Sequence, residues 1–315
     1  MVSKTSLIGI LTGPTATGKS SLAIELALNR YPKLEIINAD SLLVYREMNI
    51  GTAKPSPTEL KTVPHHLIDI RSPNETFTAG EFVRTAHTAI EEIHQRGNRA
   101  LIVGGTGFYL KALLFGLWEA PPADPQIRST LQKETNETLL MRLQERDPLA
   151  ATRIGLSDRY RLIRALEIIQ LTGKSPTQLE METPQHPSPQ FRLWILDRPT
   201  EELHIRIQKR TQTMIQDGLI EEYVHLQKNF PEARALNAVG YKQVGDYLAQ
   251  RTPSGRKLEP GLGGLDSEIQ LATRQLVKQQ RTWFKGQLSK VDTAQWFLLE
   301  DQRDKLVEQF KSVYQ

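Results

Sequence analysis

Residues 6–30 read "SLIGILTGPTATGKSSLAIELALNR", and this stretch decides the fold. The apolar run "SLIGILT" predicts a buried strand, and "SLAIELALNR" places apolar residues at helical spacing. Between them, residues 13–20 match the phosphate-loop pattern G-x-x-x-x-G-K-[S/T] at every specified position. A strand, a phosphate loop and a helix in this order predict an α/β fold with a parallel sheet, like that of the phosphate-loop NTPases.

The residue types of this loop explain how it would hold phosphate. Glycines let the backbone curl so that successive N–H groups point at an anion, and the positive end of the following helix adds to the field. Lys19 adds a point charge, and in this motif the hydroxyl of Ser20 ligates Mg²⁺. The reaction stays open, because an NTPase, a small-molecule kinase and an enzyme with a diphosphate substrate would all use such a loop. The predicted phosphate-binding residues are Gly13, Pro14, Thr15, Ala16, Thr17, Gly18, Lys19 and Ser20.

The rest of the amino half continues a doubly wound pattern. Strands are predicted at 34–40, 65–70 and 99–107, and a helix at 79–97. Ligands of such folds lie outside the carboxyl ends of the strands, so Asp40 and Thr106 should flank the phosphate loop. The other interpretation of both residues is a helix cap or a turn.

The composition limits the class of protein. With 315 residues, 39% of them hydrophobic, the chain can bury one large domain plus an insertion. The absence of cysteine excludes disulfides, thiolate nucleophiles and Cys-ligated zinc. No cleavage-site pattern and no apolar run of ~20 residues is present, which predicts a cytoplasmic protein without a membrane span. The net charge of +4 permits a nucleic-acid partner without requiring one.

Two further patterns separate the classes of phosphate-loop protein. The chain has no N-K-x-D segment to read guanine, which argues against a regulatory GTPase. The strand "LIVGG" ends in Gly104 and Gly105 instead of the acidic residue that organises Mg²⁺ and water in nucleotide-hydrolysing motors. These glycines, with Gly107, leave space that suits a bulky group passing the phosphate site. A kinase remains possible, with Asp40 as the base for an acceptor hydroxyl.

Several segments together resemble the tRNA dimethylallyltransferases, also called tRNA isopentenyltransferases. They are "GPTATGKS", "NADSLLVYREMNIGTAKP", "HHLIDI", "LIVGGTGFYLKALL", "DRYRLIRALEIIQLTGKSPT", "VGYKQV" and "TRQLVKQQRTWF", in family order from about residue 8 to residue 285. The resemblance implies transfer of a dimethylallyl group from its diphosphate to the exocyclic amine of the adenosine 3′ of the tRNA anticodon. Pyrophosphate would leave in the phosphate loop, with Mg²⁺ as the only cofactor, Lys19 as a catalytic cation and Asp40 as the base. A small-molecule kinase is the alternative.

The resemblance also implies where tRNA binds. The target adenosine would leave the anticodon loop and enter a channel, because a stacked base cannot reach such a site. The implied tRNA contacts are Asp40, Ser41, Leu42, Leu43, Thr106, Arg128, Tyr160, Arg161, Leu162, Ile163, Arg164 and Lys242. We expect a monomer whose partners are the anticodon stem-loop and dimethylallyl diphosphate.

Proline-rich borders bracket a helical stretch in the middle of the chain. We predict a first part of the core at 1–121, a helical insertion that contacts tRNA at 122–189, and the remainder of the core at 190–315. Residues 153–164 hold four arginines against Asp158 alone, which predicts a local basic face. An ordinary solvated helix surface is the other interpretation.

Two basic features follow the insertion. Arg210 shares a helix face with Leu203, Ile207 and Met214, so its guanidinium either snorkels to water or clamps an anion, and the family pattern favours a catalytic clamp on the diphosphate. Residues 269–290 contain no acidic residue. Four cations in this segment lie on one face of a helix, which predicts contact with the phosphate backbone of RNA. These four are Arg274, Lys278, Arg281 and Lys285, named here the basic stripe. The family often has K-R-Q where this chain has "KQQ" at 278–280, and some relatives have arginine at the positions of Asn237 and Lys242.

Overall fold

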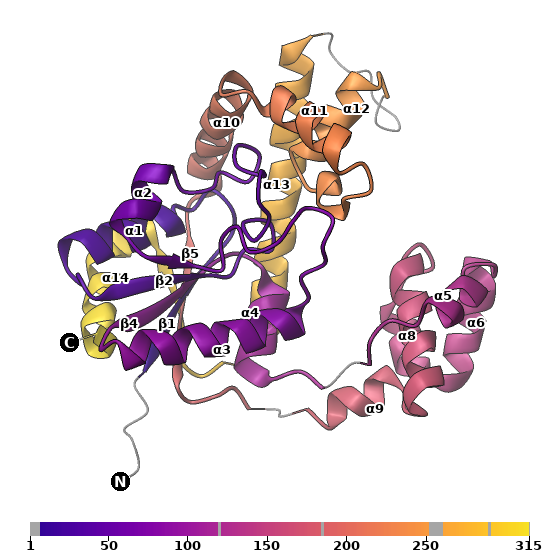
Figure 1. Cartoon of the computed structure of the whole chain (residues 1–315). Coiled ribbons are helices and arrows are strands. Elements are labelled where there is room, and N and C mark those ends of the chain that lie inside the picture. Colours follow the sequence, from indigo (N-terminus) through magenta and orange to yellow (C-terminus); the bar gives the residue numbers. More distant parts are fainter. Residues whose placement is uncertain (1–6, 119–120, 184–185, 252–260, 289–290, 315) are drawn as a thin grey trace. The chain divides into compact units, whose positions relative to one another are not determined.

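The computed structural model of the chain divides it into two compact units (Figure 1). It describes residues 7–118, 121–183, 186–251, 261–288 and 291–314. The core unit comprises Met1–Lys111 and Ser188–Gln315, and the helical unit comprises Ala112–Pro187. The first division of the chain falls inside helix α4 (Gly107–Phe115), ahead of the proline-rich segment at which the sequence predicted it.

The core unit is built on a parallel sheet of six strands in the order β3-β2-β4-β1-β5-β6. Every strand pair is parallel; Ile10 of β1, for example, lies between Ile102 of β4 and Leu193 of β5. The predicted parallel α/β fold is confirmed. The strands are β1 (Ile8–Thr12), β2 (Leu34–Asn38), β3 (His65–His66), β4 (Arg99–Val103), β5 (Phe191–Asp197) and β6 (Ala294–Leu298).

One predicted strand is much shorter than expected. The segment 65–70 was predicted to be extended throughout, but β3 contains His65 and His66 only. Leu67 and Asp69 adopt positive φ angles of 62° and 56°, which turn the backbone out of the sheet. The apolar residues that follow His66 therefore lie in a bend of the chain and not in a strand.

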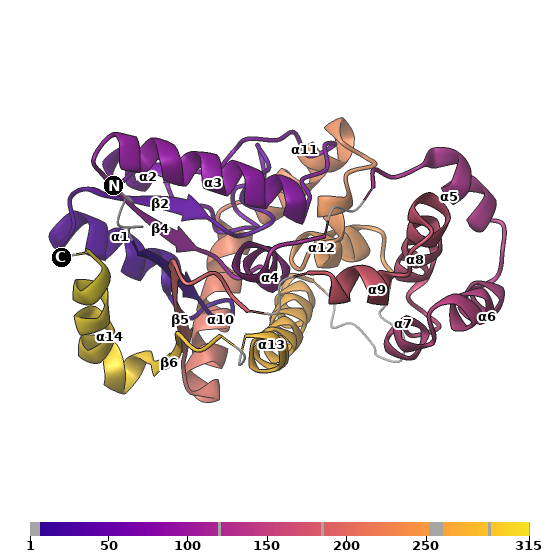
Figure 2. The same ribbon diagram turned by 90° about the horizontal axis from the view of Figure 1, so that it is seen from below.

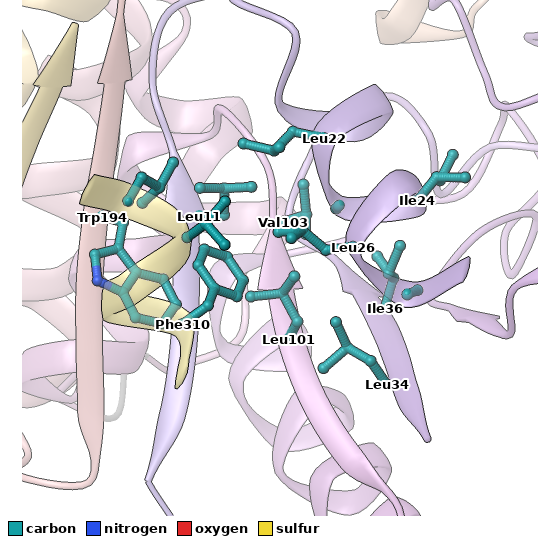
Figure 3. Packing of buried hydrophobic residues seen from close by; sticks show 14 of the residues in the cluster. Leu11, Leu22, Ile24, Leu26, Leu34, Ile36, Leu101, Val103, Trp194 and Phe310 are labelled. Carbon is teal, nitrogen blue, oxygen red and sulfur yellow. The ribbon is translucent and has the colours of Figure 1, made fainter. Parts of the chain in front are cut away.

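Helices cover both faces of the sheet (Figure 2). α1 (Lys19–Asn29) and α14 (Leu299–Tyr314) pack on the face that carries Leu11 and Leu101, and α3 (Ala79–Gln95) contacts β2 and β4 from the other side. Figure 3 shows the first of these layers, in which the rings of Trp194 and Phe310 stack with centroids 4.2 Å apart. The other helices of the core unit are α2 (Pro57–Thr62), α10 (Thr200–Gln216), α11 (Leu219–Asn229), α12 (Tyr241–Leu248), α13 (Leu262–Gln287) and the short 3₁₀ helix η1 (Arg234–Asn237).

The helical unit has its own apolar core. Leu139 and Leu143 of one helix pack against Leu162 and Leu166 of another, and all four are buried. Asp147 caps α7 by accepting a hydrogen bond from the Ala150 N–H at 2.9 Å. The helices are α5 (Pro125–Leu131), α6 (Asn136–Arg146), α7 (Pro148–Arg153), α8 (Arg159–Thr172) and α9 (Pro176–Met181). Within the described part of the chain, no helix has the length and apolar character that crossing a bilayer requires.

Candidate active site

The phosphate loop connects β1 to α1 at the carboxyl edge of the sheet. Gly13 and Gly18 have φ angles of +146° and +94°, and Ala16 between them has a φ of +66°. These left-handed angles curl the loop. A Cβ atom on Gly13 would lie 2.2 Å from the Leu196 carbonyl oxygen, so only glycine fits where the loop leaves the sheet.

Lys19 lies in the concavity of this loop. Its Nζ donates hydrogen bonds of 2.8 Å to the carbonyl oxygens of Gly13 and Pro14. Burial lowers the pKa of Lys19 to about 8, with the Asp40 carboxylate raising it and the Arg210 guanidinium lowering it further. An anion in the loop would favour the charged ammonium, because opposite charges nearby raise the pKa of a lysine.

Ser20 begins the first turn of α1 and is exposed, so its hydroxyl is accessible to a cation. Among the described residues no group of three His, Asp or Glu side chains could hold a metal ion. The Ser20 hydroxyl is an oxygen donor of the kind that Mg²⁺ uses in phosphate sites, where one or two protein oxygens are combined with phosphate and water. Ser20 is the residue of the loop that would hold it.

Asp40 follows β2 and stands beside the loop. Its Oδ1 accepts the Leu42 N–H at 2.9 Å, and its own N–H donates to the Asn38 side chain at 2.8 Å. The turn interpretation of Asp40 is therefore correct for Oδ1, while no protein hydrogen bond occupies Oδ2 among the described residues. Asp40 also acts electrostatically on both Lys19 and Arg210.

Thr106 connects the end of β4 to the segment that carries Asp40. Its hydroxyl accepts the Ser41 N–H at 2.9 Å and lies 3.2 Å from the Ser41 hydroxyl. Its carbonyl accepts the Tyr109 N–H in the first turn of α4, as predicted for a cap. Asp40, Ser41 and Thr106 thus form one cluster at the carboxyl edge of the sheet, with Leu42 and Leu43 following them partly buried.

The glycines after β4 do not leave the open space that the sequence suggested. A Cβ on Gly104 would lie 2.1 Å from the Ala39 carbonyl carbon, and one on Gly107 would lie 2.3 Å from the Trp283 ring. These two glycines allow close packing with neighbouring backbone and with an aromatic ring. No space is open on the Cβ side of Gly104 and Gly107, whereas a Cβ on Gly105 would lie 3.2 Å from Gln280 Nε2 and 3.8 Å from Lys19 Nζ.

Arg210 reaches the phosphate loop from α10. Its guanidinium lies 3.4 Å from the Thr15 hydroxyl and 3.4 Å from the Thr52 carbonyl oxygen. Burial lowers the pKa of Arg210, and the Asp40 carboxylate opposes this shift. The guanidinium therefore faces the loop and the carboxylate, an arrangement that suits an anion clamp better than a snorkelling side chain.

Three side chains that the sequence did not single out also contact this loop. Arg198 and Arg206 donate to the carbonyl oxygens of Thr17 and Ala16 at 2.8 and 2.7 Å. Gln280 of α13 accepts the Thr15 N–H at 2.9 Å and donates to the Gly105 carbonyl at 3.2 Å. The sequence contains a weak signal for Arg206, because this residue precedes Arg210 by one helical turn and so lies on the same face of the helix.

The basic stripe on α13 is partly neutralised by another element. Arg281 donates to the Asp197 carboxylate at 2.8 Å and to the Arg198 carbonyl at 2.6 Å. The predicted phosphate contact of Arg281 is thus contradicted, because the missing acid lies at the end of β5 and not on α13. Arg274 donates to Gln270, whereas Lys278 and Lys285 are exposed.

Glu167 organises the arginines of the helical unit. This carboxylate is 0% exposed and accepts Arg128 at 2.8 and 2.9 Å, Arg164 at 2.5 Å and the Asp124 N–H at 2.7 Å. Burial would raise the pKa of Glu167, but the hydrogen bonds from Arg128, Arg164 and Asp124 hold it below its usual value. Arg128 and Arg164, both predicted to contact tRNA, are primarily partners of this buried acid.

Two other predicted tRNA contacts need correction. The side chains of Leu162 and Ile163 lie in the apolar core of the helical unit, 0% and 7% exposed, because they lie on the inner side of α8, which packs against α5 and α6. Tyr160 is 57% exposed, and Arg161 forms a surface ion pair with Asp158. In the core unit, Lys242 forms an exposed ion pair with Asp246.

The chain thus contains a phosphate loop flanked by two partly buried cations, Lys19 and Arg210, and a carboxylate, which defines an enzyme of the phosphate-loop α/β class acting on a phosphorylated substrate. The sequence model of the IPP transferase family matches residues 43–287. Two curated relatives are tRNA dimethylallyltransferase 1 of Citrifermentans bemidjiense, 42% identical over 87% of this chain and 88% of its own length, and tRNA dimethylallyltransferase of Geobacter sulfurreducens, 42% identical over 90% of both.

Solved structures agree with these relatives. The full-length tRNA isopentenylpyrophosphate transferase of Bacillus halodurans superposes with a TM-score of 0.65 at 33% identity, over 98% of this chain and 95% of that one. A eukaryotic dimethylallyltransferase captured acting on tRNA shares the fold, with a TM-score of 0.79 at 24% identity over 96% of this chain and 77% of that one. The chain belongs to the IPP transferase family, the family of the tRNA dimethylallyltransferases.

The Glu167 cluster predicts how the stability of the protein depends on pH. The folded-state pKa is lowered, so the cluster stabilises the fold above the unfolded pKa of roughly 4.3 and loses this contribution as the pH falls through the folded-state value. Urea unfolding of wild type and Glu167→Gln, followed by circular dichroism, should show the wild-type advantage at pH 7 shrinking below about pH 4. An advantage that is the same at both pH values would contradict the role of ionised Glu167.

Proposed function

We propose that the chain transfers the dimethylallyl group from dimethylallyl diphosphate to the exocyclic amine of the adenosine 3′ of the anticodon in tRNA, releasing pyrophosphate. The observation that carries this proposal is the position of Asp40 beside a phosphate loop that is lined by Lys19 and Arg210. One group can accept a proton from the amine while the others stabilise charge on a departing diphosphate. We further propose that the enzyme acts as a monomer in the cytoplasm.

The reaction breaks the bond between the allylic carbon and the diphosphate oxygen and forms a bond between that carbon and the adenine nitrogen. Negative charge develops on the leaving oxygen, and Lys19, Arg210 and the loop N–H groups lie where they stabilise it. Mg²⁺ bound at Ser20 would supply further neutralisation of the diphosphate. Asp40 takes the proton that the amine loses. No nucleoside triphosphate is consumed.

Several features favour this reaction over phosphorylation of a small hydroxyl compound. β4 ends at Val103 and is followed by Gly104 and Gly105, so the position that carries the Mg²⁺-organising acid in many nucleotide hydrolases has no carboxylate. The named relatives are tRNA-modifying transferases. The test is to incubate the protein with dimethylallyl diphosphate labelled in its carbon chain and bulk tRNA. We expect label in RNA without ATP, and ATP turnover without RNA label would refute the proposal.

Asp40→Asn should reduce the single-turnover rate of transfer by about 10²- to 10⁴-fold, the usual contribution of a positioned base. Asparagine keeps the Oδ1 acceptor for the Leu42 N–H, so the turn and the fold are retained. Affinity for tRNA and for dimethylallyl diphosphate should change little. Loss of tRNA affinity with an unchanged single-turnover rate would remove Asp40 from the catalytic role.

Arg210→Gln should weaken binding of the diphosphate substrate and also slow transfer, because the guanidinium interacts with charge that is present in the ground state and grows in the transition state. Lys209→Gln is the matched control, since Lys209 is the exposed neighbour on the same helix. Steady-state kinetics should separate the two variants. A lower melting temperature with unchanged kinetics for Arg210→Gln would mean that Arg210 only stabilises the fold.

Lys278 and Lys285 are the members of the basic stripe that we propose to contact RNA phosphates. Each phosphate contact changes the slope of log affinity against log salt by roughly 0.7 to 0.9, so Lys278→Gln with Lys285→Gln should flatten the slope by roughly 1.4 to 1.8. The control removes two exposed lysines elsewhere, Lys33→Gln with Lys305→Gln. A slope equal to that of the wild-type protein would show that Lys278 and Lys285 face solvent and do not contact RNA phosphates.

A further inference from the structure

The outer side of the phosphate loop is fastened at three consecutive residues. Gln280 accepts the Thr15 N–H at 2.9 Å, Arg206 donates through Nε to the Ala16 carbonyl at 2.7 Å, and Arg198 donates through Nε to the Thr17 carbonyl at 2.8 Å. The side chains come from α10, from the residue after β5 and from α13. Hydrogen bonds from these side chains therefore hold the backbone of residues 15–17, the turn between Gly13 and Gly18.

Planarity of the peptide group converts these contacts into an orientation of the donors. In a trans peptide the carbonyl of one residue and the N–H of the next point in opposite directions, and the described residues contain no cis peptide. Fixing the carbonyls of Ala16 and Thr17 toward the arginines turns the N–H groups of Thr17 and Gly18 away from them. Within the described part of the chain neither N–H has a hydrogen-bond acceptor. Both are free to meet an anion.

Ala16 shows that this arrangement is imposed on the loop. Its φ of +66° is left-handed, a conformation that is unfavourable for a residue with a Cβ atom. The Ala16 side chain packs against Leu203 and Ile207 of α10, next to the carbonyl contact from Arg206. Helix α10 thus holds Ala16 through both its side chain and its backbone.

The two arginines lie close together in spite of their like charges. A Cβ on Gly18 would be 3.3 Å from Nη2 of Arg206 and 3.7 Å from Nη2 of Arg198. Burial, and then the charge of Arg198, lower the pKa of Arg206, while Glu202 partly compensates and is ion-paired with Arg198. A guanidinium group is planar and can donate a hydrogen bond from Nε to a carbonyl oxygen while its Nη atoms stay beside that carbonyl. This geometry suits a position where two arginines lie close together.

We propose that Arg206 and Arg198 are positioning residues for the reaction: by holding the Ala16 and Thr17 carbonyls, they aim the N–H groups of Thr17 and Gly18 at the leaving diphosphate. This inference rests on the proposed function of the loop as the site of the leaving group. The arginines act through the backbone and do not contact the diphosphate. Their effect is largest when charge builds up on the leaving oxygen, since preset donors need no reorganisation at that moment.

The test compares Arg206→Met with Lys209→Met, which removes a positive charge from the same helix without a contact to the loop. Removal of one oxyanion donor costs about 10²- to 10³-fold in kcat, so a donor that is only misdirected should cost about 10- to 100-fold. Affinity for tRNA should stay unchanged, affinity for pyrophosphate with Mg²⁺ should fall, and the amide resonances of Thr17 and Gly18 should shift in the ligand-free protein. Lys209→Met should match wild type throughout.

Two results would overturn the inference. One is a lower melting temperature of Arg206→Met with unchanged kcat and unchanged Thr17 and Gly18 amide resonances, which would indicate a purely structural role. The other is full activity of Arg206→Lys with the amides displaced as in Arg206→Met, which would indicate that charge and not orientation matters. If Arg206→Met does not fold, Arg206→Gln is measured in the same way. A wild-type protein that transfers no label to tRNA would refute the proposed function instead, because the amide and pyrophosphate measurements do not depend on the allylic group.

Discussion

The structure depends on the curl of one short segment, residues 13–20, in which backbone N–H groups converge at the positive end of α1. Such a curl requires glycine where the chain leaves the sheet, because the Leu196 carbonyl occupies the space of a side chain at Gly13. The curl also has external support, because Arg206 and Arg198 donate hydrogen bonds to carbonyl oxygens of the loop and Gln280 accepts one of its N–H groups. That support comes from α10 and α13, which lie after the helical unit in the chain.

The order of the strands in the sheet explains why the side chains that support the loop lie beside it. β5 lies next to β1, so the residues after β5 lie beside the phosphate loop that follows β1. Asp197 ends β5, holds Arg281 of α13, and is followed at once by Arg198, which holds the loop. On the other side, β4 adjoins β1 and brings Thr106 next to the segment that carries Asp40. Cation, carboxylate and loop converge because four neighbouring parallel strands, β2, β4, β1 and β5, end at one edge.

The features that the sequence predicts well are those determined by residues close together in the chain. The phosphate loop, the strand before it and the helix after it follow from local pattern, as do the amphipathic face of α3 and the placement of Asp40 at a strand end. Partners that are distant in the chain could not be predicted in this way. The basic stripe looked unpaired because Asp197 lies 84 residues from Arg281, and Arg128 and Arg164 looked available for RNA because the burial of Glu167 is a tertiary property. Likewise, the resemblance to the family implied that Leu162 and Ile163 contact tRNA, yet their spacing on α8 places them in a core.

The central claim is that the phosphate loop holds a diphosphate that leaves as a unit, so that the bond between carbon and oxygen is the one that breaks. Dimethylallyl diphosphate carrying ¹⁸O in the bridge between the allylic carbon and phosphorus distinguishes this from phosphoryl transfer. After one turnover with an anticodon stem-loop RNA, mass spectrometry of the products locates the isotope. The account predicts that all of the ¹⁸O appears in pyrophosphate, in amounts equal to the prenylated adenosine. Isotope in dimethylallyl alcohol or in dimethylallyl monophosphate would show that a bond between phosphorus and oxygen breaks instead, and would contradict it.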